Sequence, residues 1–158
     1  MNTATTTPPS GTDWRLTPAT PTDIDRIAEL RAQVMRPDLE RLGVYDPIRV
    51  RQRFRDSYTP EHTQLIEVAG TFAGCVVLRP EADTCRWLES FYVDPAHQGR
   101  GLGTAVLNAL LAHSDRENFP VRLQVLQGSP ARRLYERHGF VLEHEDPVDA
   151  FLIRLPRA

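Results

Sequence analysis

One stretch, residues 84–118, constrains the fold of this chain more than any other. It begins with TCRWLESFYV, a run rich in aromatic and apolar residues that predicts a strand ended by Asp94 and Pro95. Three glycines then alternate with other residues in QGRGLG, and an apolar pattern at helical spacing follows at once. A strand that leads through a glycine loop into a helix is typical of a sheet covered by helices.

The segments before this unit predict two helices and three strands. The first helix is expected to open at Pro21 and to end before Pro37, because the residue that precedes a proline is pushed out of helical geometry. The next segment alternates in a way that also fits an edge strand, but Asp46 followed by Pro47 favours a helix. Strands are predicted over residues 14–20 and, as a hairpin that turns at Ala69 and Gly70, over residues 62–80.

The segments after the unit complete an α/β pattern. A strand is predicted over residues 121–126, and closing strands over 140–145 and 149–156. Between them a helix is expected with Ser129 as its N-cap, Pro130 at its first position and Gly139 as the left-handed residue after its end. The order of these elements implies a mixed sheet covered by helices.

Length and composition indicate one domain over residues 14–158, behind a disordered tail of residues 1–13 rich in Thr, Pro and Ser. The net charge of −2 attracts neither nucleic acid nor an anionic membrane, and no run is apolar enough to span a bilayer. The N-terminus does not resemble a secretory signal, so a cytoplasmic location is expected. Cys75 and Cys85 are expected to be reduced side chains in apolar surroundings, and no metal site is predicted.

The glycine loop has a physical use. Gly99, Gly101 and Gly103 let the backbone approach a ligand and take positive φ, and the N-terminus of the following helix favours an anion such as a diphosphate. Arg100 adds a charged contact and Thr104 a hydroxyl. The spacing does not fit a dinucleotide fingerprint, and all 19 basic residues are arginine, so no nucleotide phosphate loop is present. The remaining alternative is a flexible corner without a ligand.

This loop resembles the acetyl-CoA-binding motif of the GNAT superfamily of N-acetyltransferases, Q/R-x-x-G-x-G/A, over residues 98–103. Downstream, SPARRLYERHGF is similar to that family's Asn-x-Ala-x-x-Leu-Tyr-x-x-x-Gly-Phe pattern, with Ser129 in place of the asparagine. The resemblance covers residues 14–155 and is strongest over 88–141. It implies a mixed, mostly antiparallel central sheet of the α/β (α+β) class, with two splayed parallel strands and flanking helices.

The resemblance also implies where acetyl-CoA binds, without a metal. Its pyrophosphate is expected on the loop amides, and its pantetheine arm along the strand of residues 87–93, in a gap that opens toward residues 123–126. The resemblance therefore assigns cofactor contacts to Phe91, Tyr92, Val93, Gln98, Gly99, Arg100, Gly101, Leu102, Gly103, Thr104, Ser129, Arg132 and Tyr135.

Two residues are candidates for proton transfer. Tyr135 aligns with the family tyrosine whose hydroxyl lies near the cofactor sulfur, and a phenol with a pKa of about 10 can protonate a departing thiolate. The alternative for Tyr135 is an aromatic residue that only packs near Phe140. Glu89 is expected to share a strand face with Phe91 and Val93, and is either the base or an ordinary salt-bridged glutamate.

The acceptor pocket is expected near the first two helices and their connection, with Arg41 and Tyr45 as candidate contacts. The arginines of the second helix fall into two stripes, 49/53 and 51/55, which favours a solvated surface over one binding patch. The acidic residues nearby fit a cationic amine equally well; they are Asp38, Glu40 and Asp46.

These features together predict an acetyl-CoA-dependent N-acetyltransferase that acts on a primary amine of a small molecule, peptide or protein. The acetyl group would pass by direct attack within a ternary complex, since no covalent nucleophile is evident. The alternative is a catalytically silent acyl-CoA-binding sensor or partner module on the same fold. Both interpretations allow a homodimer.

Overall fold

The computed structural model describes residues 13–81 and 84–158, so the tail predicted for residues 1–13 lies outside the described residues apart from Asp13. The elements follow in the order β1 (Trp14–Pro18), η1 (Pro21–Asp23), α1 (Ile24–Arg41), α2 (Pro47–Ser57), η2 (Pro60–His62), β2 (Thr63–Val68), β3 (Thr71–Pro80), β4 (Arg86–Val93), η3 (Pro95–His97), α3 (Leu102–Glu117), β5 (Val121–Leu126), α4 (Ala131–Arg137), β6 (Val141–Glu145) and β7 (Asp149–Arg154).

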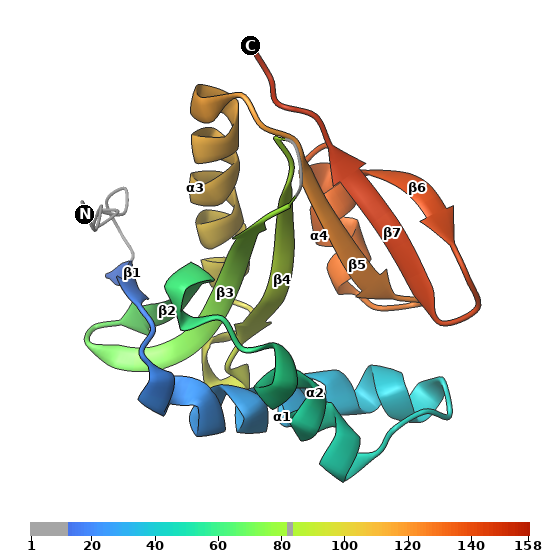
Figure 1. The fold of residues 1–158 in the computed structure, drawn as a ribbon. Coiled ribbons are helices and arrows are strands. Elements are labelled where there is room, and N and C mark those ends of the chain that lie inside the picture. Colours follow the sequence, from blue (N-terminus) through green and yellow to red (C-terminus); the bar gives the residue numbers. More distant parts are fainter. Residues whose placement is uncertain (1–12, 82–83) are drawn as a thin grey trace.

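A seven-stranded sheet in the order β1-β2-β3-β4-β5-β7-β6 forms the centre of the domain. The pairs are antiparallel except for β4 and β5, which run parallel and diverge toward one end (Figure 1). The expected fold class, a mixed and mostly antiparallel sheet with splayed parallel strands, is therefore confirmed. Crossover helix α3 connects the two parallel strands, as a parallel pair requires.

Helices cover both faces of the sheet. On one face, the stripe of α3 that contains Val106 and Leu107 packs against sheet residues such as Ile66 and Leu152, all of them almost fully buried. On the other face, α1 and α2 cover a smaller apolar cluster; its members include Ile27, Leu30, Phe54, Leu65, Cys75 and Tyr92. Burial of these side chains away from water is the main force that holds the layers together.

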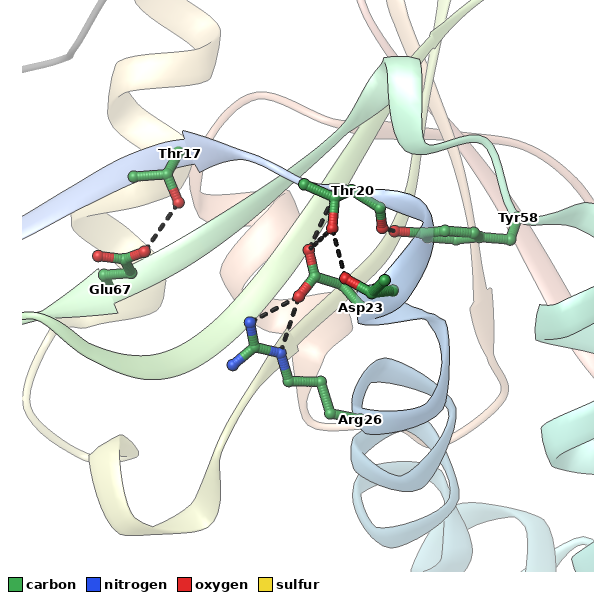
Figure 2. Close-up of polar contacts among 7 residues, drawn as sticks. Thr17, Thr20, Asp23, Arg26, Tyr58 and Glu67 are labelled. Carbon is green, nitrogen blue, oxygen red and sulfur yellow. Dashed lines mark hydrogen bonds and ion pairs between the residues drawn. The ribbon is translucent and has the colours of Figure 1, made fainter.

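A polar network fixes the entry of the chain into α1 (Figure 2). The carboxylate of Asp23 accepts hydrogen bonds from the backbone N–H of Thr20 at 2.8 Å and from the guanidinium of Arg26 at 2.6 and 3.1 Å. Burial acts to raise the pKa of Asp23, but the bonds from Thr20 and Arg26 outweigh it and lower that pKa. Tyr58, just after α2, donates to the carbonyl of Thr20 at 2.7 Å. The network thus ties both helices to the end of β1.

The prediction that the first helix ends before Pro37 is wrong, because α1 runs through this residue to Arg41. A proline removes one backbone hydrogen bond. Two ion pairs span the same turns, Arg36 with Glu40 at 2.6 Å and Arg41 with Asp38 at 2.5 Å. Both pairs are largely exposed and contribute little. The last turn of α1 is also held by the rest of the molecule, because Arg41 donates to the carbonyl of Gln127.

Most of the other predicted boundaries are confirmed within a few residues. The carboxylate of Asp46 accepts from the N–H groups of the next turn at 2.9 Å, so α2 is a helix and not an edge strand. Ala69 and Gly70 have positive φ values at the hairpin turn, and Gly139 follows α4 with φ 93°. Cys75 and Cys85 are buried and free. None of the described helices is both long and apolar enough to cross a membrane.

Candidate active site

The parallel strands β4 and β5 pair over three residues only, Arg86–Leu88 with Val121–Leu123. Beyond this point β4 contains a bulge, because Val77 and Cys75 of β3 lie opposite Glu89 and Tyr92. Two residues of β4 thus oppose one of β3, and Ser90 within the bulge has a φ of +45°. A bulge bends its strand, and here it accompanies the divergence of β4 from β5.

The bulge depends on a close approach by β3. A Cβ atom at Gly74 would collide with the backbone carbonyl of Tyr92, so only glycine fits this position. The bulge takes the backbone carbonyl of Ser90 out of the hydrogen-bond ladder between the strands. The Cys75 thiol donates a hydrogen bond to this carbonyl at 3.1 Å instead. Burial raises the pKa of Cys75 to about 12, so this side chain stays a neutral thiol.

The bulge changes which β4 side chains share a face. Glu89 and Tyr92 pair with Val77 and Cys75, which lie on the same face of β3, so both side chains point toward α1 and α2. Phe91 and Val93 pack on the opposite face, which α3 covers. The expectation that Glu89 shares a face with Phe91 and Val93 is therefore wrong. Strict alternation fails here because the bulge inserts one residue.

Divergence of the strands leaves a backbone donor of β4 without a neighbouring strand. The N–H of Asp94 points to β3, where it donates to the carbonyl of Ala73 at 2.7 Å. Successive N–H groups along a strand point to opposite sides, so the N–H of Val93 points into the gap between β4 and β5. A ligand that lies in this gap can accept this hydrogen bond.

The glycine loop follows directly from this strand end. The Gln98 side chain donates to the carbonyl of Val93 at 2.8 Å and ties the loop to β4. Gly99 and Gly101 take left-handed φ values of +76° and +78°, and a Cβ at either position would meet no atom within 4 Å. The loop backbone is therefore open on its outer side, at the N-terminus of α3, where N–H groups and the helix dipole favour an anion. Arg100 is exposed beside it.

A cleft of about 930 Å³ opens along the gap. The divergent parts of β4 and β5 line it, together with α1 and α2 on one side and the start of α4 and the β6–β7 turn on the other. The cleft brings together several residues that the sequence analysis singled out: Glu89, Phe91, Tyr92, Ser129 and Tyr135. Val93, Arg132 and the glycine loop lie outside its lining, as do Arg41 and Tyr45.

Tyr135 packs near Phe140 and also lines the cleft. Its ring lies edge-on to that of Phe140, with the ring centroids 5.6 Å apart. Burial raises the pKa of the Tyr135 phenol well above its usual range, and the neighbouring Tyr92 adds to this shift. The hydroxyl is therefore protonated throughout the neutral pH range and can donate a proton or a hydrogen bond.

Glu89 is held by an ion pair across the strands. Both Nε and Nη2 of Arg79 donate to Oε1 of Glu89, at 2.8 and 2.5 Å. The side chain is 34% exposed. Because both bonds end on Oε1, the other oxygen, Oε2, is available to accept a proton or a hydrogen bond from a water molecule.

The remaining predicted contacts have protein partners of their own. The Ser129 hydroxyl accepts from the N–H of Ala131 at 3.3 Å. The prediction of Ser129 as the N-cap is wrong by one residue, because Pro130 is the N-cap and α4 begins at Ala131. Arg132 pairs with Glu136 at 3.3 Å. Arg41 pairs with Asp38 and donates to the carbonyl of Gln127, which joins the end of α1 to the loop after β5. The Tyr45 ring lies 5.0 Å from the guanidinium of Arg36.

Arg31 is a cleft residue that the sequence analysis missed. From α1 its Nη1 donates to the Tyr92 hydroxyl at 2.7 Å, and its Nε donates to the carbonyl of Val50 in α2 at 2.9 Å. Arg31 lies on a helix rich in charged residues, and nothing local in the sequence distinguishes it from its neighbours. Its position follows from the packing of α1 on the bulged part of β4.

Comparison with known proteins identifies the family of this chain and its fold. A sequence model of the acetyltransferase (GNAT) family matches residues 24–140. The spermine/spermidine N(1)-acetyltransferase of Bacillus subtilis (strain 168) is 36% identical over 62 residues, which cover 37% of this chain and 41% of that protein. The chain thus matches less than half the length of this curated relative.

Two solved structures show the same fold at low sequence identity. The PaiA N-acetyltransferase of Thermoplasma acidophilum, in complex with coenzyme A, superposes with a TM-score of 0.70 and 18% identity, over 90% of this chain and 98% of that one. The ribosomal-protein-S18-alanine N-acetyltransferase of Escherichia coli superposes with a TM-score of 0.69 and 17% identity, over 92% of this chain and 96% of that one.

Proposed function

This chain belongs to the acetyltransferase (GNAT) family, and we propose that it transfers an acetyl group from acetyl-CoA to a primary amine. The observation that carries the proposal is the three-residue pairing of β4 with β5, which leaves the Val93 N–H pointing into the gap between these strands, beside the cleft that Tyr135 lines. The relatives support an amine acceptor, since their names specify a polyamine and an alanine of a ribosomal protein.

The residues present fit acetyl-CoA, which supplies an acetyl group activated as a thioester. The open backbone of residues 98–103 and the N-terminus of α3 would hold its diphosphate, with Arg100 as a charged partner. The Val93 N–H would hold the pantetheine arm or polarise the thioester carbonyl. Binding both substrates in one cleft makes the attack intramolecular in effect.

Tyr135 is the proposed acid. As the amine nitrogen forms a bond to the acetyl carbon, the carbon–sulfur bond breaks and the sulfur leaves with the electron pair. The Tyr135 hydroxyl donates its proton to this sulfur. Burial keeps the phenol protonated beforehand, and the proton that returns to it comes from solvent.

Glu89 is the proposed acceptor of the proton that the amine loses. An amine attacks in its neutral form, so a proton must leave the nitrogen before or during the transfer. Glu89 lines the cleft and Arg79 binds only its Oε1, so Oε2 would take this proton directly or through water. Arg79 holds the carboxylate in place while it does so.

The first test is the melting temperature with and without saturating acetyl-CoA, with NADH and ATP as controls. A ligand at ~100 times its dissociation constant stabilises the folded state by about 2.7 kcal/mol, which raises the melting temperature of a domain of this size by roughly 5–10 °C. A shift with acetyl-CoA alone supports the proposed site. The absence of a shift would remove both the enzyme and the acyl-CoA-binding module from consideration.

The second test separates an enzyme from a silent binding module. Tyr135→Phe should lower kcat by roughly a hundredfold, the scale of general acid catalysis, and leave the acetyl-CoA affinity within about twofold of the original. Thiol release on an amine acceptor measures the first quantity, and the thermal shift measures the second. An unchanged kcat would exclude Tyr135 as the acid, and acetyl-CoA binding without acetylation of any amine would favour the binding module.

A further inference from the structure

The arginines of α2 divide into two groups with different surroundings. Arg51 pairs with Glu29 at 2.7 Å, and Arg55 pairs with Asp25 at 3.1 Å, so both point back to α1. Arg49 and Arg53, one turn apart on the same helix, line the cleft instead. The two stripes expected from the spacing therefore exist, and one of them belongs to the wall of the site.

Arg31 of α1 adds a third guanidinium to this wall. Its Nε donates to the carbonyl of Val50 and its Nη1 to the hydroxyl of Tyr92, which hold the guanidinium beside another residue of the cleft lining. Within the described residues, neither Arg31, Arg49 nor Arg53 forms an ion pair with a carboxylate. Three positive charges thus face one cavity without a charged protein partner in contact.

The carboxylates that line the cleft are mostly engaged elsewhere. Asp38 pairs with Arg41, and Glu89 pairs with Arg79. Asp46 lies near Arg49, but its Oδ1 accepts from the backbone N–H groups at the start of α2. The other two lie across the cleft, on the opposite side from α1 and α2: Asp146 and Asp149, of which Asp146 accepts two backbone N–H groups of its own turn.

The guanidinium groups without an ion-pair partner therefore lie on the α1–α2 wall, where Asp38 and Asp46 are engaged elsewhere, and Asp146 and Asp149 lie across the cleft near the β6–β7 turn. We infer that the acceptor of this enzyme is an amine that also carries an anionic group, a carboxylate or a phosphate, which Arg31, Arg49 and Arg53 bind. This inference rests on the proposed acetyltransferase function. Guanidinium groups suit both anions, since they bind them through paired hydrogen bonds. The charge on the opposite wall orients the amine end of the same molecule away from the arginines.

Matched acceptors test the inference. Thiol release from acetyl-CoA is measured with γ-aminobutyrate and its amide, with O-phosphoethanolamine and ethanolamine, with the dipeptides Ala-Glu and Ala-Gln, and with spermidine. The expected result is a kcat/KM roughly tenfold or more higher for the anionic member of at least one pair. The carboxylate and phosphate pairs distinguish the two sources of the charge. Added salt should raise KM for the anionic member and leave that of its neutral partner unchanged.

Substitutions on one helix provide the control. Arg49→Gln and Arg53→Gln should each raise KM for the preferred anionic amine by at least about threefold, and together by roughly tenfold, with kcat little changed. Arg51→Gln and Arg55→Gln remove the same charge from the same helix outside the cleft and should leave KM within about twofold. Equal effects from both pairs would show that only the general field of α2 matters, and would overturn the assignment.

The outcomes separate this inference from the proposed function. Failure of acetyl-CoA to raise the melting temperature refutes the proposed function itself. If acetyl-CoA binds and the neutral amines or spermidine are the better acceptors, the inference is wrong and the function stands. If acetyl-CoA binds and no anionic amine is acetylated, the inference is equally wrong.

Discussion

Alanine substitutions at two glycines of one loop should have opposite effects on stability. Gly101 has a left-handed φ of +78°, and nothing lies within 4 Å of a Cβ built there. Alanine at this position gains no contact and takes the left-handed conformation, which costs an L-residue about 1–2 kcal/mol. For a chain of this length, each kcal/mol lowers the melting temperature by about 2–4 °C. The expected fall is therefore roughly 2–8 °C.

Gly103 provides the matched comparison two residues later. It lies in the first turn of α3, and its Cβ would meet only the Leu134 side chain, at an ordinary contact distance of 3.9 Å. Alanine favours a helix over glycine by up to about 1 kcal/mol. Gly103→Ala should therefore leave the melting temperature unchanged or raise it by a few degrees.

Thermal and urea unfolding followed by circular dichroism measure both variants, without ligand. Similar losses of stability in the two would refute the conformational reasoning, because only Gly101 is strained by a side chain. A second readout concerns the proposed site. The new Cβ at Gly101 projects to the open side of the loop, so this variant should also lose most of the stabilisation by acetyl-CoA.

Three further results are expected. Gly74→Ala should lower the free energy of unfolding by about 3 kcal/mol or more in urea titration, because the Cβ meets the Tyr92 carbonyl and the backbone cannot yield cheaply; a loss below 1 kcal/mol would mean that the bulge adapts. Asp115→Asn should cost about 2–4 kcal/mol at neutral pH, since it leaves the nearly buried Arg154 without its carboxylate. Hydrogen bonds from Arg154 lower the pKa of Asp115, so this contribution to stability is present above about pH 4 and is lost as the pH falls further. Urea titrations at several pH values should therefore show that the free energy of unfolding of the variant falls less steeply with acid than that of the original protein. An identical fall in both would contradict the assignment. Glu89→Gln should lower kcat by roughly a hundredfold and leave the thermal shift with acetyl-CoA unchanged, whereas a purely structural role predicts a lower melting temperature with kcat little changed.

Local signals in the sequence were sufficient for most elements of the fold. Asp46 followed by Pro47 predicted the start of α2, and Ser129 followed by Pro130 predicted the start of α4 to within one residue. The glycine spacing predicted an open loop with positive φ at three glycines; this holds for Gly99 and Gly101, whereas Gly103 is helical because α3 begins at Leu102. These predictions succeed because caps, turns and glycine conformations are decided by neighbours a few residues apart. Pro37 is the exception, since α1 continues through it to Arg41, whose side chain contacts the carbonyl of Gln127 in the loop after β5.

The geometry of the candidate site depends on contacts between distant segments. The bulge at Ser90 forms between the pairs that β4 makes with Val77 and Cys75 of β3, next to the close approach at Gly74, and it places Glu89 on the face opposite Phe91 and Val93. No periodicity within β4 contains that information, because a bulge is a property of two paired strands.

The same holds for the charges of the cleft. The spacing of the α2 arginines defined two stripes, but only the position of α1 decides that Arg51 and Arg55 meet carboxylates while Arg49 and Arg53 face the cavity. Arg31 enters the site by packing alone. The sequence therefore determined the elements and the nature of the loop, because these follow from short-range conformational preferences. The tertiary structure decided which side chains share the cleft, because that depends on how separate elements pack together.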